Sequence, residues 1–254
     1  MRYFWNNLID GSSVTFTETS EDSEYPVENL ADQRIGNPWK TGSTVALEAV
    51  IIDMGEAVDV DAFICHAHDL LDTDSVIKIQ ANSSNSWGSP PVNESLTRVA
   101  GPIVKIWDTT QSYRYWRFTF TKASAGVARS IGRIFLGEMF TALNPIDKGY
   151  KEKLVDPSVV TESLPGQIYS NTKTPWREFS LNFDGIGNTE KSSYKTMIDA
   201  VGIHTAIFVQ VSATVSTFTE YLNVFFTEVP EFDYVVTSED DVIWKMGIKL
   251  REVK

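Results

Sequence analysis

The strongest constraint on the fold of this chain is residues 113–121, where apolar and polar side chains alternate. Successive side chains of an extended strand point to opposite faces of a sheet. One face would carry Trp116, Phe118 and Phe120, and the other would carry Tyr113, Tyr115, Arg117 and Thr119. This period predicts a β-strand with one side in a hydrophobic core and the other towards solvent.

Shorter strand candidates lie on both sides of this segment. In one of them Ile77 and Ile79 share a face, while Val76 falls on the opposite side. The candidates are residues 49–53, 61–65, 76–80 and 131–140. Several short strands with Gly, Pro, Asn and Ser between them are typical of an antiparallel sandwich, so residues 1–143 are expected to form one β-sandwich domain.

Residues 144–175 have a different character. Asn144 and Pro145 open the segment, Thr174 and Pro175 close it, and no helical or strand period persists between them. A loop of this length would be uncommon inside a compact domain. We therefore interpret residues 144–175 as a connector, or as an arm that pairs with a neighbouring molecule.

Residues 176–254 carry a second pattern, which predicts an α+β domain of several strands and one helix. The alternation in residues 179–183 is that of a half-buried strand. A helix is expected to begin near Asn188 and to end at Gly202. Its apolar face would comprise Tyr194, Met197, Ile198 and Val201. The whole chain is thus expected to be mainly β, with one flanking helix.

The charge and composition of the chain restrict its partners. The formal net charge is −12 at pH 7 over 254 residues, so we expect neither nucleic acid nor an anionic membrane surface as a partner. We find no secretory signal and no apolar run long enough to span a bilayer, and we expect synthesis in the cytoplasm. The single cysteine, Cys65, follows Phe63 and Ile64 and is expected to be a buried thiol.

The sequence offers one cluster of possible metal ligands. His66 and His68 would share one face of a strand, and Asp69, Asp72 or Asp74 would supply a third ligand. The simpler interpretation is a strand that runs into a polar turn formed by the aspartates. Two histidines alone are a weak metal signal, so we assign no metal and no cofactor.

The sequence gives little support for an enzyme. Glu18, Glu21, Asp22 and Glu24 lie in a polar run without signs of desolvation, and residues 239–241 are most simply a solvated acidic turn. A glycoside hydrolase would need two carboxyl groups close together, one of them with a raised pKa. We find no nucleophile, Walker or dinucleotide motif. We therefore expect a protein without catalytic residues.

Tryptophans near turns are the remaining candidates for a binding site. An exposed indole can stack on the apolar face of a sugar ring. Trp87 lies among small polar residues and is as suited to this role as to packing, whereas Trp39 is expected to lie in the core. The candidate glycan-binding residues are His68, Asp69 and Trp87.

Several motifs of the first section resemble the discoidin, or galactose-binding-like, jelly roll. They are residues 25–30 followed by Trp39 and Lys40, residues 50–55, and residues 113–118. The motifs at 68–70 and 131–137 are most similar to copies found in phage tail proteins. The resemblance implies a jelly-roll fold for residues 1–143. The chain departs from the family in having one cysteine instead of a pair, and in showing no apolar spikes in its loops.

The last section resembles phage tail-tube and distal-tail domains, and residues 244–253 are similar to their final strand. The resemblance implies a virion structural protein, a ring-forming distal or minor tail component with an outward jelly roll and other tail proteins as partners. A ring would also pair strand edges that otherwise promote aggregation. The alternative is a glycan-binding module for host attachment. Either role places the mature protein in the virion tail.

Overall fold

The computed structural model describes residues 1–42, 45–71, 73–124, 126–143, 151–162, 164, 166–211, 220–236 and 242–254. The chain divides into two compact units. The N-terminal unit comprises residues 4–139, and the C-terminal unit comprises residues 1–3 and 140–254. The described part is mainly β, with antiparallel strand pairs and the α-helix that the sequence predicts.

The strands of the N-terminal unit are β1 (Arg2–Asn7, shared at its start with the other unit), β2 (Thr15–Glu18), β3 (Trp39–Lys40), β4 (Leu47–His68), β5 (Ser75–Asn82), β6 (Val92–Ser95), β7 (Ile103–Thr121) and β8 (Ser130–Thr141). Short 3₁₀ helices occupy Leu8–Asp10 and Val27–Ala31. The sequence predicted two strands within β4. The structure has one, because Gly55 takes a positive φ of 81° and the strand continues through a bulge.

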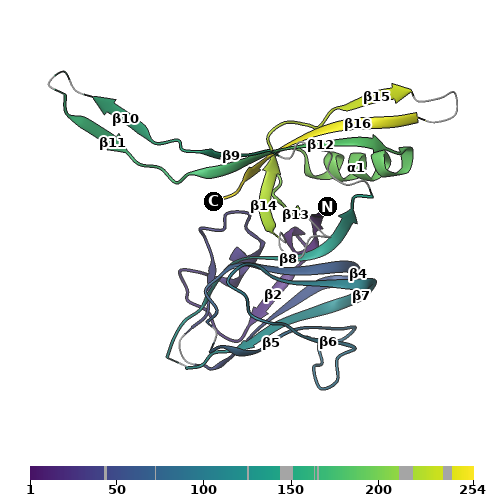
Figure 1. Ribbon diagram of the computed structural model, residues 1–254. Helices are drawn as coiled ribbons and strands as arrows, with labels where there is room; N and C mark the ends of the chain where they lie inside the picture. Colours follow the sequence, from purple (N-terminus) through teal and green to yellow (C-terminus); the bar gives the residue numbers. More distant parts are fainter. Residues whose placement is uncertain are drawn as a thin grey trace. The chain divides into compact units, whose positions relative to one another are not determined.

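The long strands β4 and β7 organise the N-terminal unit into a jelly-roll β-sandwich (Figure 1). They pair with each other along most of their length, with register shifts after Asp53 and after Val60. The first part of β4 also pairs with β2, and the second part of β7 pairs with β5, which in turn pairs with β6. The second part of β4 pairs with β8. One half of the paired strands β4 and β7 therefore belongs to one layer of the sandwich, and the other half belongs to the other layer.

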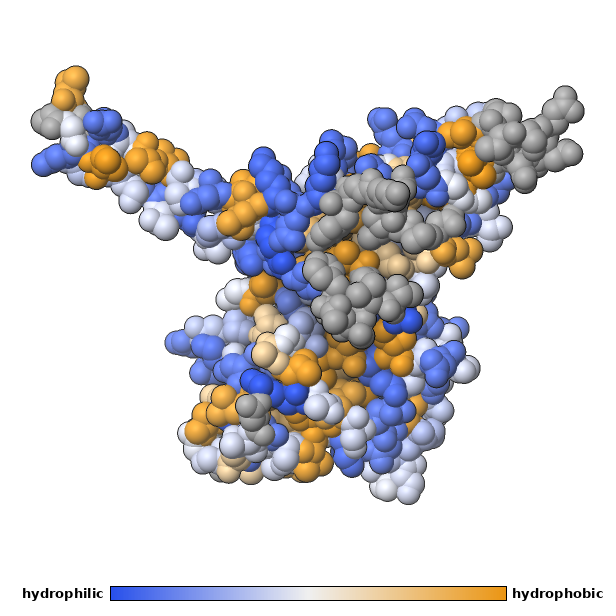
Figure 2. Space-filling model, viewed as in Figure 1, coloured by the Kyte–Doolittle hydropathy of each residue, from blue (hydrophilic) through white to orange (hydrophobic). Residues whose placement is uncertain are grey.

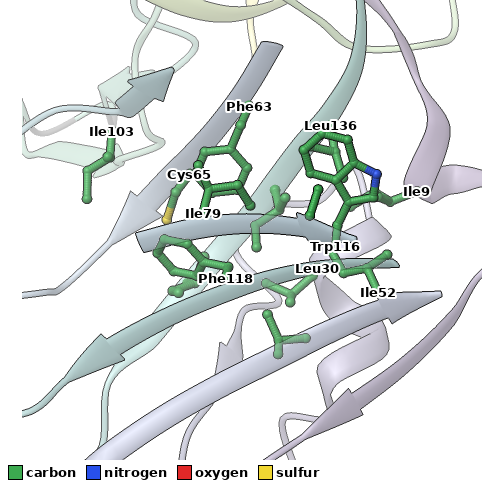
Figure 3. Packing of buried hydrophobic residues seen from close by; sticks show 14 of the residues in the cluster. Ile9, Leu30, Ile52, Phe63, Cys65, Ile79, Ile103, Trp116, Phe118 and Leu136 are labelled. Carbon is green, nitrogen blue, oxygen red and sulfur yellow. The ribbon is translucent and has the colours of Figure 1, made fainter. Parts of the chain in front are cut away.

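The core of the N-terminal unit lies between these layers. Figure 3 shows Trp116 and Phe118 of β7 facing the interior together with Phe63 and Cys65 of β4. Trp116 is fully buried, as the alternation predicted, and so is Trp39. Cys65 is fully buried, which confirms the prediction of a buried thiol, and this burial raises its pKa.

The strands of the C-terminal unit are β9 (Lys151–Val155), β10 (Val159–Glu162), β11 (Ile168–Asn171), β12 (Trp176–Ile186), β13 (Ile207–Gln210), β14 (Tyr221–Phe226), β15 (Phe232–Val236) and β16 (Val242–Glu252). Its main sheet has the order β9–β12–β16–β14–β13, and β15 also pairs with β16. Helix α1 (Asn188–Val201) packs against this sheet (Figure 1). The α+β prediction is confirmed.

Helix α1 forms where the sequence predicted it. Gly202 ends it with a positive φ of 53°, and its N–H donates to Ile198 O at 2.8 Å. Tyr194 is fully buried, with its ring centroid 4.8 Å from that of Phe140 and 5.6 Å from that of Tyr3. These aromatic contacts explain why residues 1–3 group with the C-terminal unit.

The described residues of the segment interpreted as a connector include three strands, β9, β10 and β11. Strand β9 pairs with β12 and so belongs to the main sheet, while β10 and β11 form a separate two-stranded hairpin. Residues 144–150 lie outside the described residues. Sequence reasoning found no strand signal here because the hairpin is exposed on both faces, so its residues show no alternation of apolar and polar side chains. No helix in the described ranges is long and apolar enough to cross a membrane.

Candidate functional site

Two buried ion pairs tie loops together at one end of the N-terminal unit. Arg129 Nε lies 2.6 Å from Asp74 Oδ2, and Lys122 Nζ lies 2.6 Å from Glu48 Oε1. Lys122 also donates to Gly42 O at 2.7 Å. These residues join the β3–β4, β4–β5 and β7–β8 connections. We call the described residues of segments 41–47, 68–76, 98–102 and 122–130 the loop end.

Two of the three predicted glycan-binding residues, His68 and Asp69, lie at the loop end. His68 Nε2 lies 3.0 Å from Gly101 O, and burial lowers the pKa of the imidazole. A neutral ring that donates from Nε2 satisfies this contact. Asp69 Oδ1 accepts the Ser130 N–H at 2.7 Å. Both side chains therefore hold loops to the sheet, which accounts for their positions without a ligand.

The predicted histidine cluster does not form a metal site in the structure. Ala67 has a positive φ of 53°, which interrupts the regular alternation between His66 and His68. Asp74 is committed to its ion pair with Arg129, and Asp72 lies outside the described residues. Across the part of the chain that is described, no three His, Cys, Asp or Glu side chains lie close enough to hold a metal.

Carboxylates of the acidic run near the N-terminus accept hydrogen bonds from backbone N–H groups in turns. Glu21 Oε2 accepts the Val27 N–H at 3.0 Å, and Asp22 Oδ1 accepts the Glu24 N–H at 3.0 Å. Burial raises the pKa of Glu18, although the neighbouring acidic side chains are exposed. The second acidic candidate, residues 239–241, lies outside the described residues.

The loop end exposes aliphatic side chains that the sequence did not reveal. Leu71 is 49% exposed, and similar exposure is found for Leu47, Val76, Val99 and Val127. The expectation that these loops carry no apolar spikes is therefore wrong. Sequence reasoning missed them because isolated aliphatic residues in polar loops do not differ in pattern from residues that fold back into the core.

The third predicted residue, Trp87, lies in the β5–β6 connection. Asn82 Nδ2 donates to Ser86 O at 2.6 Å and closes this loop. The indole is half-buried, and its Nε1 donates to Asn85 Oδ1 at 2.8 Å. The guanidinium carbon of Arg117 lies 4.5 Å from the centroid of the indole ring, a cation–π stacking distance. The orientation of Trp87 is thus fixed from two sides.

Trp87 stands beside a polar layer of the sheet, which we call the polar face. It is the side of β5, β6 and β7 away from the core and comprises Lys78, Gln80, Asn82, Asn93, Ser95, Tyr115, Arg117 and Thr119. Arg117 Nε and Nη2 donate to Gln80 Oε1 at 2.8 and 2.6 Å, and Gln80 Nε2 donates to Asn93 Oδ1 at 2.9 Å. These bonds order one side chain on each of three strands. The sequence placed Arg117 on this face but did not single it out.

The structure does not bring the three predicted residues together. The loop that contains Asp69 leads into the start of β5, at Ser75, whereas Trp87 follows the opposite end of β5, at Asn82. A strand of this length spans about 25 Å. His68 and Asp69 therefore belong to one end of the sandwich and Trp87 to the other, and they cannot contact the same small ligand.

No family model and no curated protein matches the chain. Several solved structures are similar to it. A GH29 fucosidase of Ruminococcus gnavus in complex with fucose is 15% identical, with a TM-score of 0.46 over 53% of this chain. The match spans 27% of that enzyme, so the chain corresponds to only a part of it.

Two smaller proteins are similar along almost their whole length. A family 32 carbohydrate-binding module from NanJ of Clostridium perfringens, in complex with galactose, is 16% identical over 55% of this chain and 100% of its own, with a TM-score of 0.42. A fucose-binding module of Streptococcus pneumoniae is 13% identical over 52% of this chain and 95% of its own, also with a TM-score of 0.42. At these identities and scores, the similarities assign no function.

Proposed function

We propose that the N-terminal jelly roll is a carbohydrate-binding module without catalytic activity. The observation that carries this proposal is the placement of Trp87. Its ring is held by Asn85 and Arg117 at the border of a hydrogen-bonding face, and part of it remains accessible. Sugars bind through apolar C–H faces and hydroxyl groups, which aromatic rings and amide or guanidinium groups recognise.

A glycan array with the purified chain tests this proposal. Trp87→Ala is expected to lower binding at least 10-fold, because it removes the stacking surface and leaves the core intact. His68→Ala is the matched comparison at the other end of the sandwich and is expected to retain binding. Loss of binding in His68→Ala alone would move the site to the loop end. Absence of binding to every glycan would refute the carbohydrate function.

A second proposal concerns the C-terminal unit, for which we infer a structural role in a larger assembly, a ring in a virion tail. The β10–β11 hairpin supports it. Both of its faces carry exposed apolar side chains, and Figure 2 shows such side chains along it. They include Val159, Val160, Ile168 and Tyr169, which are 54–71% exposed. An isolated two-stranded hairpin is marginally stable in water, so a partner that covers these faces would stabilise it.

The oligomeric state tests the structural role. The purified chain is expected to form a multimer in size-exclusion chromatography with light scattering, and Val160→Asp with Ile168→Asp is expected to yield monomers. These residues share one face of the hairpin, and burying two carboxylates in an interface is unfavourable. Ser83→Asp with Ser84→Asp adds the same charge at exposed positions outside the hairpin and is expected to assemble. A wild-type chain that stays monomeric at high concentration would contradict this role.

A further inference from the structure

We propose that Arg117, beside Trp87 on the polar face, binds the carboxylate of an acidic saccharide, a uronic acid or sialic acid unit. This inference rests on the proposed carbohydrate-binding function and names the class of ligand. The combination that points to it is a guanidinium that has no acidic partner among the described residues, is stacked on an aromatic ring and lies beside oriented amide groups.

Arg117 has N–H donors that its hydrogen bonds to Gln80 do not use. Its Nε and Nη2 both point to the single acceptor Gln80 Oε1. A guanidinium carries five N–H donors in one plane. Within the described ranges, no carboxylate lies in salt-bridge distance of Arg117, and its Nη1 has no acceptor. Stacking on Trp87 occupies a face of the guanidinium and leaves its edge, where the N–H groups lie, for a ligand.

Four other arginines of the N-terminal unit are neutralised by aspartates. The pairs are Arg34–Asp32, Arg114–Asp53, Arg129–Asp74 and Arg133–Asp10, with distances of 2.6–3.0 Å. In a chain with a net charge of −12, acidic partners are plentiful. The amide of Gln80, rather than a carboxylate, faces Arg117. An amide orients the guanidinium without cancelling its charge, which suits a group that receives an anion.

The amide chain also fixes which atoms face an incoming ligand. Gln80 accepts from Arg117 through Oε1, so its Nε2 donates to Asn93 Oδ1. Asn93 then offers its own Nδ2 N–H groups, which have no acceptor among the described residues. Asn93 is exposed, whereas Gln80 is 5% exposed and cannot easily reorient. The neighbouring groups are therefore donors, which favour a carboxylate or a hydroxyl oxygen.

The charges around Arg117 are compatible with an anionic ligand. Lys78 lies on the same face, opposite Thr119, and no described carboxylate pairs with it. Asp53 lies across β7 on the same side of the sheet, but its carboxylate accepts from Arg114 at 2.7 Å and from the Gly55 N–H at 2.8 Å. The polar face thus combines two cations with a carboxylate that is already engaged.

Isothermal titration with paired sugars tests the proposal. The probes are trigalacturonate and its carboxyl-reduced trimer, and sialyllactose and lactose. We expect at least one acidic sugar to bind 10-fold or more tightly than its neutral counterpart, and to bind more weakly as salt is raised. Arg117→Gln is expected to abolish this preference, because the bidentate charged contact is lost.

Arg34→Gln is the matched control, since it removes the same charge from an arginine that is paired with Asp32 and lies outside the polar face. It is expected to keep the preference for acidic sugars, and thermal unfolding shows whether each variant is folded. Equal binding of acidic and neutral sugars would overturn the inference and leave the carbohydrate function standing. Binding of neither class would overturn both. A preference that survives in folded Arg117→Gln would also overturn the role of Arg117.

Discussion

Lys122→Met is expected to destabilise the N-terminal unit by about 3–5 kcal/mol, the usual effect of removing one partner of a buried ion pair. The side chains of Lys122 and Glu48 are both 0% exposed, and the ammonium also donates to Gly42 O. Methionine fills the space of lysine but leaves the Glu48 carboxylate buried without a counter-charge. The midpoint of urea unfolding, followed by far-UV circular dichroism, measures the loss.

The double variant Glu48→Gln with Lys122→Met separates charge from packing. A neutral amide can still accept from Ser20 Oγ, which donates to Glu48 in the wild-type protein. We expect this variant to recover most of the lost stability, because no unpaired charge remains buried. If the single and double variants were equally unstable, the cost would come from packing and our account of the ion pair would fail.

Trp116→Ala is the second substitution with a large expected effect, a loss of about 3–5 kcal/mol in the free energy of unfolding. Trp116 is fully buried, and its ring centroid lies 5.5 Å from that of Trp107 and 6.4 Å from that of Tyr113. Its Nε1 also donates to Tyr113 O at 3.2 Å. Alanine would remove these contacts and leave a cavity between the two layers.

Trp87→Ala provides the comparison, because it deletes the same side chain at a half-buried loop position. We expect it to cost about 1 kcal/mol or less, since surface truncations rarely do more. Urea unfolding of the two variants under one set of conditions checks both values. Equal losses would mean that Trp87 is a structural residue of the sheet, which would also weaken the proposed binding site.

The alternation in residues 113–121 predicted the centre of the N-terminal fold correctly. Trp116, Phe118 and Phe120 are fully buried, because a strand that covers a core must place every second side chain inside. The limits of the strands were less predictable. Strand β7 begins ten residues earlier, at Ile103, where burial is irregular and the register with β4 shifts. A bulge preserves pairing but disrupts the period on which the prediction depends.

The candidate site was also predicted only in part. The sequence indicated Trp87 as an aromatic residue in a polar turn and placed Arg117 on the polar side of its strand. It could not show that the two residues stack, since Trp87 lies in a loop and Arg117 lies in a strand 30 positions later in the sequence. It also grouped His68 and Asp69 with Trp87, although β5 separates them. Residue type is local information, whereas the shared surface depends on strand order and register.

The sequence by itself determined the secondary-structure classes, the buried face of the central strand, helix α1 with its end at Gly202, and the burial of Cys65. Each of these follows from the chemistry of neighbouring residues. Only the tertiary structure decided that β4 is one strand, that β9, β10 and β11 form, and that Arg117 has no acidic partner among the described residues while Arg34, Arg114, Arg129 and Arg133 have one. Such features depend on which distant segments meet, because pairing and burial are set by the fold as a whole.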